Sequence, residues 1–396
     1  MNTEEIVAAD KEYFMNVFGD RTMVAEKGEG VYLYDNEGNK YLDFSAGIAV
    51  NALGHNHPKV TEAIKDQAEN LLHASNIYYF EIQAKLSQLL VENTCADKVF
   101  YANSGAEANE GALKLARKYF KKQGQEKYEI IATSESFHGR TLATLAATGQ
   151  KKYQKPFTPL PAGFSFVPYN DLAAVEEEIS EQTAAVMVEP IQGEGGVNPA
   201  SQEYLAGLRE LCDEHNILLI LDEVQTGIGR TGSLFAYQQY NIEPDIFTSA
   251  KALGNGVPVS ALLARGEVAD AFEPGDHAST FGGNPLACRA AYATLSTILD
   301  EDILYSVNQI GSYFKEELIS LEKKHDLILD VKGRGLMLGV EVDADPQLIR
   351  EKMLEKGVLI LKAGKNVLRF VPPLIIEVED VKEVVTKLDE VLNELN

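Results

Sequence analysis

Short apolar runs alternate with longer amphipathic stretches through the middle of the chain. Runs rich in Val and Ile predict strands, and apolar positions spaced three and four residues apart predict the helices between them. Strands that are apolar throughout and separated by helices are typical of a mostly parallel sheet covered by helices on both faces, so we predict an α/β fold. The strands are expected at residues 98–101, 129–133, 184–188, 217–221 and 245–248, and two of the helices at residues 106–120 and 202–215.

The two ends of the chain show a different pattern. Residues 30–35 and 37–43 predict a hairpin whose turn lies around residues 36–39. After about residue 290 we expect a long helix, then a strand-rich stretch from Val331, and finally an amphipathic C-terminal helix.

The length of 396 residues exceeds what one hydrophobic core usually organises, so we expect two domains. A large α/β domain is predicted for residues 51–289, and a small α+β domain for residues 1–50 together with residues 290–396. In a mostly parallel sheet, ligands bind beyond the carboxyl ends of the strands. The polar residues that directly follow each apolar run are therefore the candidates for function.

The chain is strongly acidic, with 60 Asp and Glu against 36 Lys and Arg and a net charge of −24. Such a charge repels nucleic-acid phosphates and anionic lipid surfaces, so we expect neither as a partner. The simplest role of this acidity is to keep the protein soluble.

The three cysteines, Cys95, Cys212 and Cys288, are far apart and form no CxxC pair. Their spacing argues against a disulfide framework or a zinc site and favours a reducing compartment.

The N-terminus lacks a basic segment followed by an apolar stretch, so we expect no signal or transit peptide. The longest apolar runs, such as residues 217–221, are far shorter than the roughly 20 residues of a membrane helix. We therefore expect a cytoplasmic protein.

Polar groups follow several of the predicted strands. Asp222 comes directly after residues 217–221, and Lys251 follows residues 245–248. A turn containing Gly105 separates the first predicted strand of the large domain from its helix. Taken singly, each has a plain structural reading: a solvated lysine, a helix cap and a tight turn.

Together these groups match one type of cofactor. A lysine among apolar neighbours can have a lowered pKa and attack an aldehyde. A buried carboxylate needs a cationic partner, which a protonated pyridine nitrogen supplies. A glycine turn at a helix start offers N–H groups to a phosphate. Aldehyde, pyridinium and phosphate are the three functional groups by which a protein can bind pyridoxal 5′-phosphate (PLP).

Several further segments of the chain form one ordered set. They are residues 43–55, 103–110, 136–140, 189–196, 221–232, 249–254 and 279–285. In the order and spacing of these segments the chain resembles the class III (ornithine-type) aminotransferases over nearly its whole length. This resemblance implies the fold type I architecture of PLP-dependent transferases, with PLP in each subunit. One departure lies in the phosphate turn, where Ala106 stands in place of the Thr of many relatives, and the lost hydroxyl should weaken PLP binding modestly.

The resemblance implies roles for the residues around the PLP ring. Lys251 would form the Schiff base and then carry the proton between substrate carbon and cofactor. Asp222 would keep the ring nitrogen protonated, which makes the ring an electron sink. Gln225 would hydrogen-bond the 3-hydroxyl group of the ring. Val224 would pack on one ring face, with Phe137 stacked on the other.

It also implies that the site is shared between two subunits. Gly105 and Ala106 would bind the phosphate, with help from Thr280 of a second subunit. Ser279 of that partner would assist in substrate binding. The resemblance therefore implies a homodimer with its active sites at the subunit interface.

Three further residues are implied in substrate recognition. Arg140 would pair with a substrate carboxylate in bidentate fashion. Glu194 and Arg369 would form a switch. They pair with each other while an ornithine-type donor is bound, and Arg369 is freed to take the α-carboxylate when glutamate is bound.

The implied reaction transfers an amino group from N-acetylornithine to 2-oxoglutarate, by a ping-pong route through pyridoxamine phosphate, in arginine biosynthesis. Residues 44–51 lack the tyrosine that ornithine-specific relatives carry there. Other ω-amino donors stay open: ornithine, succinylornithine, N-succinyldiaminopimelate and 4-aminobutyrate. An aminomutase or racemase, or a degenerate binding protein on the same fold, is disfavoured because Lys251, Asp222, Glu194 and Arg369 are all retained.

Four other signals are set aside. Residues 227–232 match GxGxxG, but no acidic residue follows at the distance that a dinucleotide fold requires. His55 and His57 lack recognisable further ligands, so we predict no metal site and interpret them as a helix-start turn. His138 is assigned no catalytic role, and Cys288 is interpreted as a core residue.

Overall fold

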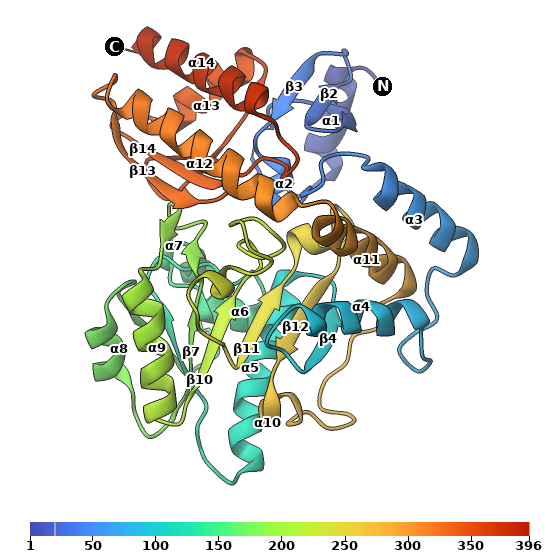
Figure 1. The fold of residues 1–396 in the computed structure, drawn as a ribbon, viewed down its shortest axis with the longest axis vertical. Coiled ribbons are helices and arrows are strands. Elements are labelled where there is room, and N and C mark those ends of the chain that lie inside the picture. Colours follow the sequence, from blue (N-terminus) through green and yellow to red (C-terminus); the bar gives the residue numbers. More distant parts are fainter. Residues whose placement is uncertain (20, 396) are drawn as a thin grey trace.

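A mostly parallel sheet lies at the centre of the computed structural model, which describes residues 1–19 and 21–395 (Figure 1). Its seven strands follow the order β4-β12-β11-β10-β7-β5-β6. All neighbours pair in parallel except β12, which is antiparallel to both β11 and β4. The strands are β4 (Lys98–Ala102), β5 (Glu129–Thr133), β6 (Phe164–Val167), β7 (Thr183–Val188), β10 (Leu218–Asp222), β11 (Ile246–Ser249) and β12 (Ser260–Ala264).

Helices cover both faces of this sheet, as the sequence predicts. Side chains alternate between the faces of a strand, and β10 shows the result. Leu219 and Leu221 belong to one hydrophobic cluster with α9 (Gln202–Glu214), while Leu218 and Ile220 belong to a second cluster with α5 (Gly105–Lys122). Burying each of these leucine or isoleucine side chains contributes about 1.5–3 kcal/mol. The predicted α/β class is therefore confirmed.

Two smaller sheets flank the central one. The first joins the predicted N-terminal hairpin to a strand from near the C-terminus, in the order β1-β2-β3-β15, so that the two ends of the chain meet. The second has the order β13-β14-β17-β16 and is called the C-terminal sheet below. The strands are β1 (Ala25–Glu29), β2 (Tyr32–Asp35), β3 (Lys40–Asp43), β13 (Ile328–Arg334), β14 (Met337–Val342), β15 (Val358–Leu359), β16 (Leu361–Ala363) and β17 (Val367–Phe370), and a short ribbon pairs β8 (Ile191–Gln192) with β9 (Asn198–Pro199).

The helix after about residue 290 differs from the prediction. Two helices occupy this region, α11 (Pro285–Asp300) and α12 (Ile303–Glu322), because Asp302 adopts a left-handed backbone with φ 54° that ends the first helix. The amphipathic C-terminal helix is present as α14 (Val378–Leu395). The other helices are α1 (Thr3–Tyr13), α2 (Ala46–Ala49), α3 (Pro58–Asn70), α4 (Glu81–Glu92), α6 (Leu142–Ala147), α7 (Lys151–Gln154), α8 (Leu172–Glu178), α10 (Gly266–Ala269) and α13 (Pro346–Glu355).

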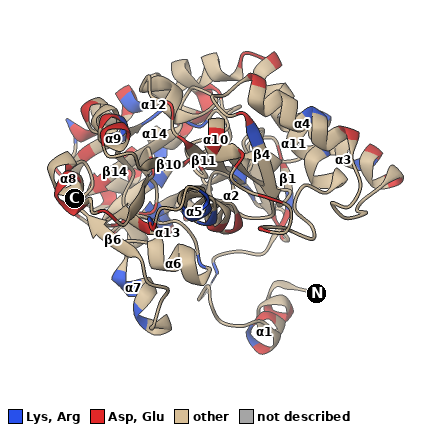
Figure 2. Ribbon diagram, turned by 90° about the horizontal axis from the view of Figure 1, so that it is seen from below, with Lys and Arg blue, Asp and Glu red and all other residues tan. Residues whose placement is uncertain are grey.

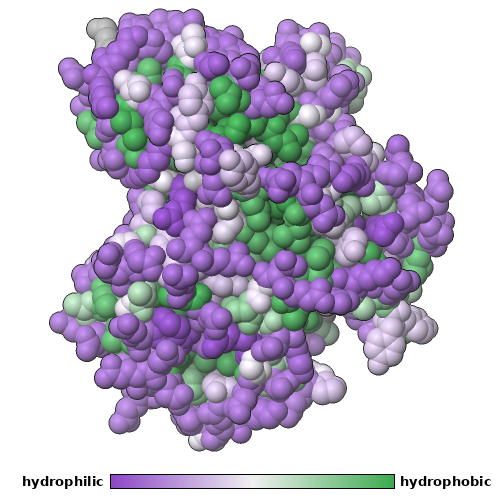
Figure 3. Space-filling view, in the orientation of Figure 1, coloured by the Kyte–Doolittle hydropathy of each residue, from purple (hydrophilic) through white to green (hydrophobic). Residues whose placement is uncertain are grey.

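Charge and hydrophobicity are distributed unevenly over the molecule. Figure 2 shows acidic and basic residues on many of the helices, with α1 at one edge of the fold. The face in Figure 3 is largely hydrophilic, with hydrophobic residues gathered in the middle of the view. Within the described residues, no helix combines the length and the apolar character needed to cross a membrane. Cys288 is fully buried in α11, as predicted for a core residue.

Candidate active site

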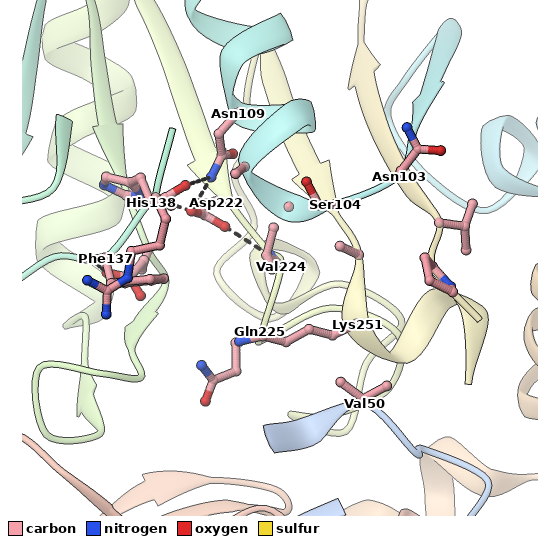
Figure 4. Close-up of a pocket in the computed structure, with 18 of the residues that line it drawn as sticks. Val50, Asn103, Ser104, Asn109, Phe137, His138, Asp222, Val224, Gln225 and Lys251 are labelled. Carbon is pink, nitrogen blue, oxygen red and sulfur yellow. Dashed lines mark hydrogen bonds and ion pairs between the residues drawn. The ribbon is translucent and has the colours of Figure 1, made fainter. Parts of the chain in front are cut away.

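A cavity of about 430 Å³ lies beyond the carboxyl ends of the parallel strands (Figure 4). Segments that are far apart in the chain meet there because the ends of parallel strands lie at one edge of the sheet. The cavity brings together eight of the residues singled out in the sequence. They are Gly105, Ala106, Phe137, Arg140, Asp222, Val224, Gln225 and Lys251.

Lys251 begins the short 3₁₀ helix η3 (Lys251–Gly254), directly beyond β11. Its φ of 42° is left-handed, a strained conformation for a residue with a side chain. The amide of Asn255 fixes this turn by accepting a hydrogen bond from Leu53 N (2.8 Å) and donating one to Gly54 O (3.2 Å). Burial, together with the positive charge of Arg369, lowers the pKa of Lys251 to about 8, although the negative charge of Glu194 opposes this shift. A neutral, nucleophilic amine is therefore accessible near neutral pH.

Asp222 ends β10 and is held by three hydrogen bonds. Its Oδ2 accepts one from Asn109 Nδ2 and lies beside His138 Nδ1, both at 2.8 Å, and its Oδ1 accepts one from Val224 N at 3.0 Å. Asn109 is itself fixed, since its Oδ1 accepts a hydrogen bond from Thr248 Oγ1 at 2.7 Å. The carboxylate is only 4% exposed and has one defined orientation.

Glu189 and His138 are buried titratable residues of the cavity wall that the sequence interpretation left without a role. Burial raises the pKa of Glu189 to about 7, although its oxygens accept hydrogen bonds from the backbone of Phe137 and Gly193. Burial by itself would lower the pKa of His138, but the hydrogen bond and charge of Asp222 raise it overall. The Nε2 atom of His138 is buried without a partner among the described residues.

The first turn of α5 forms one end of the cavity. Ser104 caps the helix, and its Oγ accepts a hydrogen bond from Glu107 N. The N–H groups of Gly105 and Ala106 belong to the first helical turn, which has no intrahelical acceptors, and the helix dipole favours an anion there. A Cβ atom on Gly105 would lie 2.8 Å from Val224 Cγ1, so only glycine leaves this space open.

Arg140 lies at the exposed side of the cavity. Its guanidinium carbon is 4.0 Å from the ring centre of Tyr153 and 5.3 Å from that of Phe137. It forms no ion pair within residues 1–19 and 21–395. Stacking on two aromatic rings orients the guanidinium and leaves its N–H groups available to an incoming carboxylate.

Glu194 and Arg369 form an ion pair beside the cavity. Arg369 lies on β17 of the C-terminal sheet, and its Nη1 donates to Glu194 Oε1 at 2.6 Å and to Gln225 Oε1 at 3.2 Å. Burial alone would raise the pKa of Glu194, but the charges of Arg369 and Lys251 lower it overall. The predicted pair is thus assembled, and Gln225 links it to the cavity.

Ser279 and Thr280 do not line the cavity of their own chain. Ser279 Oγ accepts hydrogen bonds from Asn103 Nδ2 (3.2 Å) and Gly282 N (2.9 Å), whereas Thr280 is exposed. The roles predicted for these two residues therefore require a second subunit.

No group of three or more His, Cys, Asp or Glu residues suited to a metal ion occurs in the described part of the chain.

The cavity fits PLP. The open first turn of α5 offers N–H groups to a phosphate. The buried carboxylate of Asp222 faces the same space and suits a protonated ring nitrogen, and Lys251 supplies an amine. Val224 and Phe137 also line this space, where they can cover the faces of a planar ring.

Comparison with known proteins agrees with this chemistry. The acetylornithine aminotransferase of Caldanaerobacter subterraneus subsp. tengcongensis is 52% identical, over 98% of this chain and 100% of that protein. The solved acetylornithine aminotransferase of Elizabethkingia anophelis has a TM-score of 0.90 and 38% identity, with 99% of each chain covered. An ornithine aminotransferase structure from Toxoplasma gondii, described with partial occupancy of PLP at its active site, has a TM-score of 0.95 and 36% identity over 100% of this chain and 96% of that one.

The family description "Aminotransferase class-III" matches residues 15–392, which is almost the entire sequence. The fold agrees with that match, and so does a cavity with a lysine, a buried aspartate and an open helix start. The chain therefore belongs to the class-III aminotransferases and is a PLP-dependent enzyme.

Proposed function

We propose that the enzyme transfers the terminal amino group of N-acetylornithine to 2-oxoglutarate, giving N-acetylglutamate semialdehyde and glutamate. The observation that carries this proposal is the Glu194–Arg369 pair at 2.6 Å, which neutralises one of the two arginines near the cavity. A donor with one free carboxylate needs one arginine, and a dicarboxylic acceptor needs two. The similarity to acetylornithine aminotransferases over nearly the full chain supports the choice of donor.

The cofactor, when bound, supplies an aldehyde for the amino group and a ring that withdraws electrons from the substrate carbon. Lys251 would hold the cofactor through Nζ and would move a proton at the substrate carbon, a role that suits its pKa of about 8. Asp222 would keep the ring nitrogen protonated. Gln225 would offer its amide N–H to the 3-oxygen of the ring, since its Oε1 already accepts a hydrogen bond from Arg369.

Arg140 binds the carboxylate of the donor at the open side of the cavity. With N-acetylornithine present, Arg369 stays paired with Glu194 and takes no part in binding. When 2-oxoglutarate or glutamate enters, the side chain of Arg369 leaves Glu194 and binds the α-carboxylate, while Arg140 binds the other carboxylate. One cavity thereby accepts both substrates without a large rearrangement.

We also propose a homodimer in which Ser279 and Thr280 reach the substrate and the phosphate in the cavity of the partner. An exposed apolar patch beside these residues supports the dimer. Ile77, Tyr79 and Phe281 are 78%, 105% and 60% exposed, and Asn76 Nδ2 ties their loops together by donating to Ser279 O at 3.1 Å. A patch of this kind is typical of a protein interface.

The wider setting is part of the same proposal. The reaction serves arginine biosynthesis in the cytoplasm. The large and small domains divide as residues 51–289 on one side and residues 1–50 with 290–396 on the other. The meeting of β3 and β15 in one sheet supports a small domain built from both ends of the chain.

An absorbance titration of the PLP-loaded enzyme tests the function. N-acetylornithine should remove the band of the lysine-bound cofactor at lower concentration than ornithine, succinylornithine or 4-aminobutyrate, and 2-oxoglutarate should restore it. Bleaching at the lowest concentration by another donor would replace the substrate. Borohydride reduction and peptide mass spectrometry should find the pyridoxyl group on Lys251, and a label on another lysine would contradict its role.

A further inference from the structure

The GxGxxG segment, residues 227–232, joins the cofactor-binding turn to the C-terminal sheet. It begins two residues after Gln225 and packs backbone against backbone with the turn between β13 and β14. Leu336 N donates to Arg230 O at 3.0 Å, and a Cβ atom on Gly335 would lie only 2.6 Å from the carbonyl carbon of Thr231. This segment therefore serves close packing between two parts of the fold.

Arg230, within this segment, is fully buried and forms no ion pair with a carboxylate in the part of the chain that the structure describes. Its Nη1 donates to Leu336 O (3.0 Å) and to Pro372 O (2.5 Å), while Nε and Nη2 are buried without partners among the described residues. A buried charge without a counter-ion costs stability, and an apolar residue of similar size is often the more stable choice. Stability alone therefore does not account for an arginine here.

The position of the two carbonyl acceptors suggests what Arg230 does. Pro372 follows Arg369 by three residues and lies two residues beyond the end of β17. Arg369 makes the reverse contact, since its Nη1 donates to Gln225 Oε1 at 3.2 Å. Two arginines thus bridge the same pair of segments, residues 225–230 and 369–372, one from each side. Arg369 must break its bonds to bind a substrate carboxylate, whereas Arg230 lies outside the cavity and keeps its own.

We propose that Arg230 is a positioning residue for the dicarboxylate substrate. It fixes the backbone after Arg369 against the cofactor-binding turn, so that the Arg369 side chain can move between Glu194 and a substrate carboxylate while its strand stays in place. In a variant without Arg230, the contact between Arg369 and Gln225 is the one arginine bridge left between these two segments. That bridge is also lost whenever Arg369 leaves Gln225. The inference rests on the role proposed above for Arg369.

The test measures binding of glutarate, an unreactive dicarboxylate, to the PLP-loaded enzyme by calorimetry. Arg230→Met should raise the dissociation constant of glutarate about tenfold, the effect of losing roughly one buried hydrogen bond of this kind. The KM for 2-oxoglutarate should rise with it, while kcat/KM in the N-acetylornithine half-reaction should change less than about threefold. Arg230→Lys keeps the charge and can reach one of the two carbonyls, so it should recover part of the affinity.

Arg334→Gln is the matched control. Arg334 also connects the C-terminal sheet to the central part of the fold, through Nη1 to Gln239 Oε1 at 2.7 Å, but at an exposed position. The substitution Arg334→Gln should leave the dissociation constant of glutarate unchanged. If Arg230→Met binds glutarate normally while Arg369→Met does not, the inference fails and the proposed function stands. If Arg369→Met also binds glutarate normally, the proposed role of Arg369 fails and the inference with it.

Loss of the cofactor band in Arg230→Met would show a disrupted fold. In that case the rates of the two half-reactions in Arg230→Lys test the inference. An equal fall in both half-reactions of Arg230→Lys would overturn the inference, because a general structural defect does not distinguish the substrates. A fall confined to the dicarboxylate half-reaction would support it.

Discussion

His138 Nδ1 lies 2.8 Å from Asp222 Oδ2, and the two side chains are 2% and 4% exposed. Asn109 donates to the same oxygen, so Asp222 is oriented by the protein alone. An ionised group that is held in place before its partner arrives needs no reorganisation during the reaction. The buried wall of the cavity therefore holds Asp222 in one orientation, as the proposed contact with a ring nitrogen requires.

Replacing His138 by alanine should weaken the cofactor complex. Asp222 would lose one of its two donors to Oδ2 in a buried setting, which costs about 1–3 kcal/mol and predicts a rise of about tenfold or more in the PLP dissociation constant. Fluorescence titration of the cofactor-free protein measures this constant. His215→Ala, at an exposed position after α9, is the control. An unchanged PLP affinity in His138→Ala would show that Asn109 suffices to hold Asp222.

Arg369→Met should separate the two half-reactions. The proposed role of Arg369 makes it a charged hydrogen-bonding partner of glutamate, so the rate with glutamate should fall about 10- to 100-fold. The half-reaction with N-acetylornithine should fall much less, since Arg369 is paired with Glu194 in that state. Single-turnover measurements of each half-reaction test this. Glu194→Gln should have the opposite preference and damage the N-acetylornithine half-reaction more. Equal losses in both half-reactions of Arg369→Met would refute the switch.

Glu189 should make the stability of the cofactor-free protein depend on pH. Burial raises its pKa from 4.5 to about 7, so between these values the folded state binds more protons than the unfolded chain. Stability from this group is fully present below about pH 4.5 and is lost as the pH rises through about 7. Relative to Glu189→Gln, which cannot titrate, the wild type should lose about 3 kcal/mol between pH 4.5 and 8.

Urea unfolding at a series of pH values measures this difference. Glu223 also has its pKa raised by burial to about 7, but it is present in both proteins and its effect cancels in the comparison. Parallel stability curves for the wild type and Glu189→Gln would mean that Glu189 stays ionised in the folded protein.

Gly105→Ala should prevent tight binding of the cofactor phosphate. The new Cβ would lie 2.8 Å and 2.9 Å from the two methyl groups of Val224, a stiff β-branched side chain. Either the helix start or Val224 must shift, and both line the cavity. The double variant Gly105→Ala/Val224→Ala removes the clash and should bind PLP more tightly than Gly105→Ala. No recovery in the double variant would point to a requirement of the glycine backbone itself.

The strands predicted from β-branched runs are present almost residue for residue, because short buried strands of a parallel sheet are apolar on both faces. Strand β12 was not predicted. Its residues, Ser-Ala-Leu-Leu-Ala, have no local preference for a strand. They form a strand because they pair with β4 on one side and β11 on the other. Similarly, the break between α11 and α12 depends on the backbone at Asp302, which no apolar pattern reveals.

Eight cavity residues were predicted because they follow strands or belong to motifs of the resembled family. Glu189 was missed, although it directly follows the strand β7, and the same rule would have identified it. Asn109 and His138 were missed for a different reason. Their partner Asp222 lies 113 and 84 residues away in the sequence, and only the folded chain brings the three together.

The wall of the cavity extends along the chain from Val50 to Val259, and Arg369 comes later still. A growing polypeptide therefore has no complete cavity wall until residue 259 has been made, and it lacks Arg369 until nearly the whole chain has been made. The vitamin-derived cofactor cannot guide the early steps of folding and can only stabilise a chain that has already folded, by mass action. In a cell that is short of vitamin B6, the amount of this enzyme would then depend on how well the empty chain resists unfolding and proteolysis.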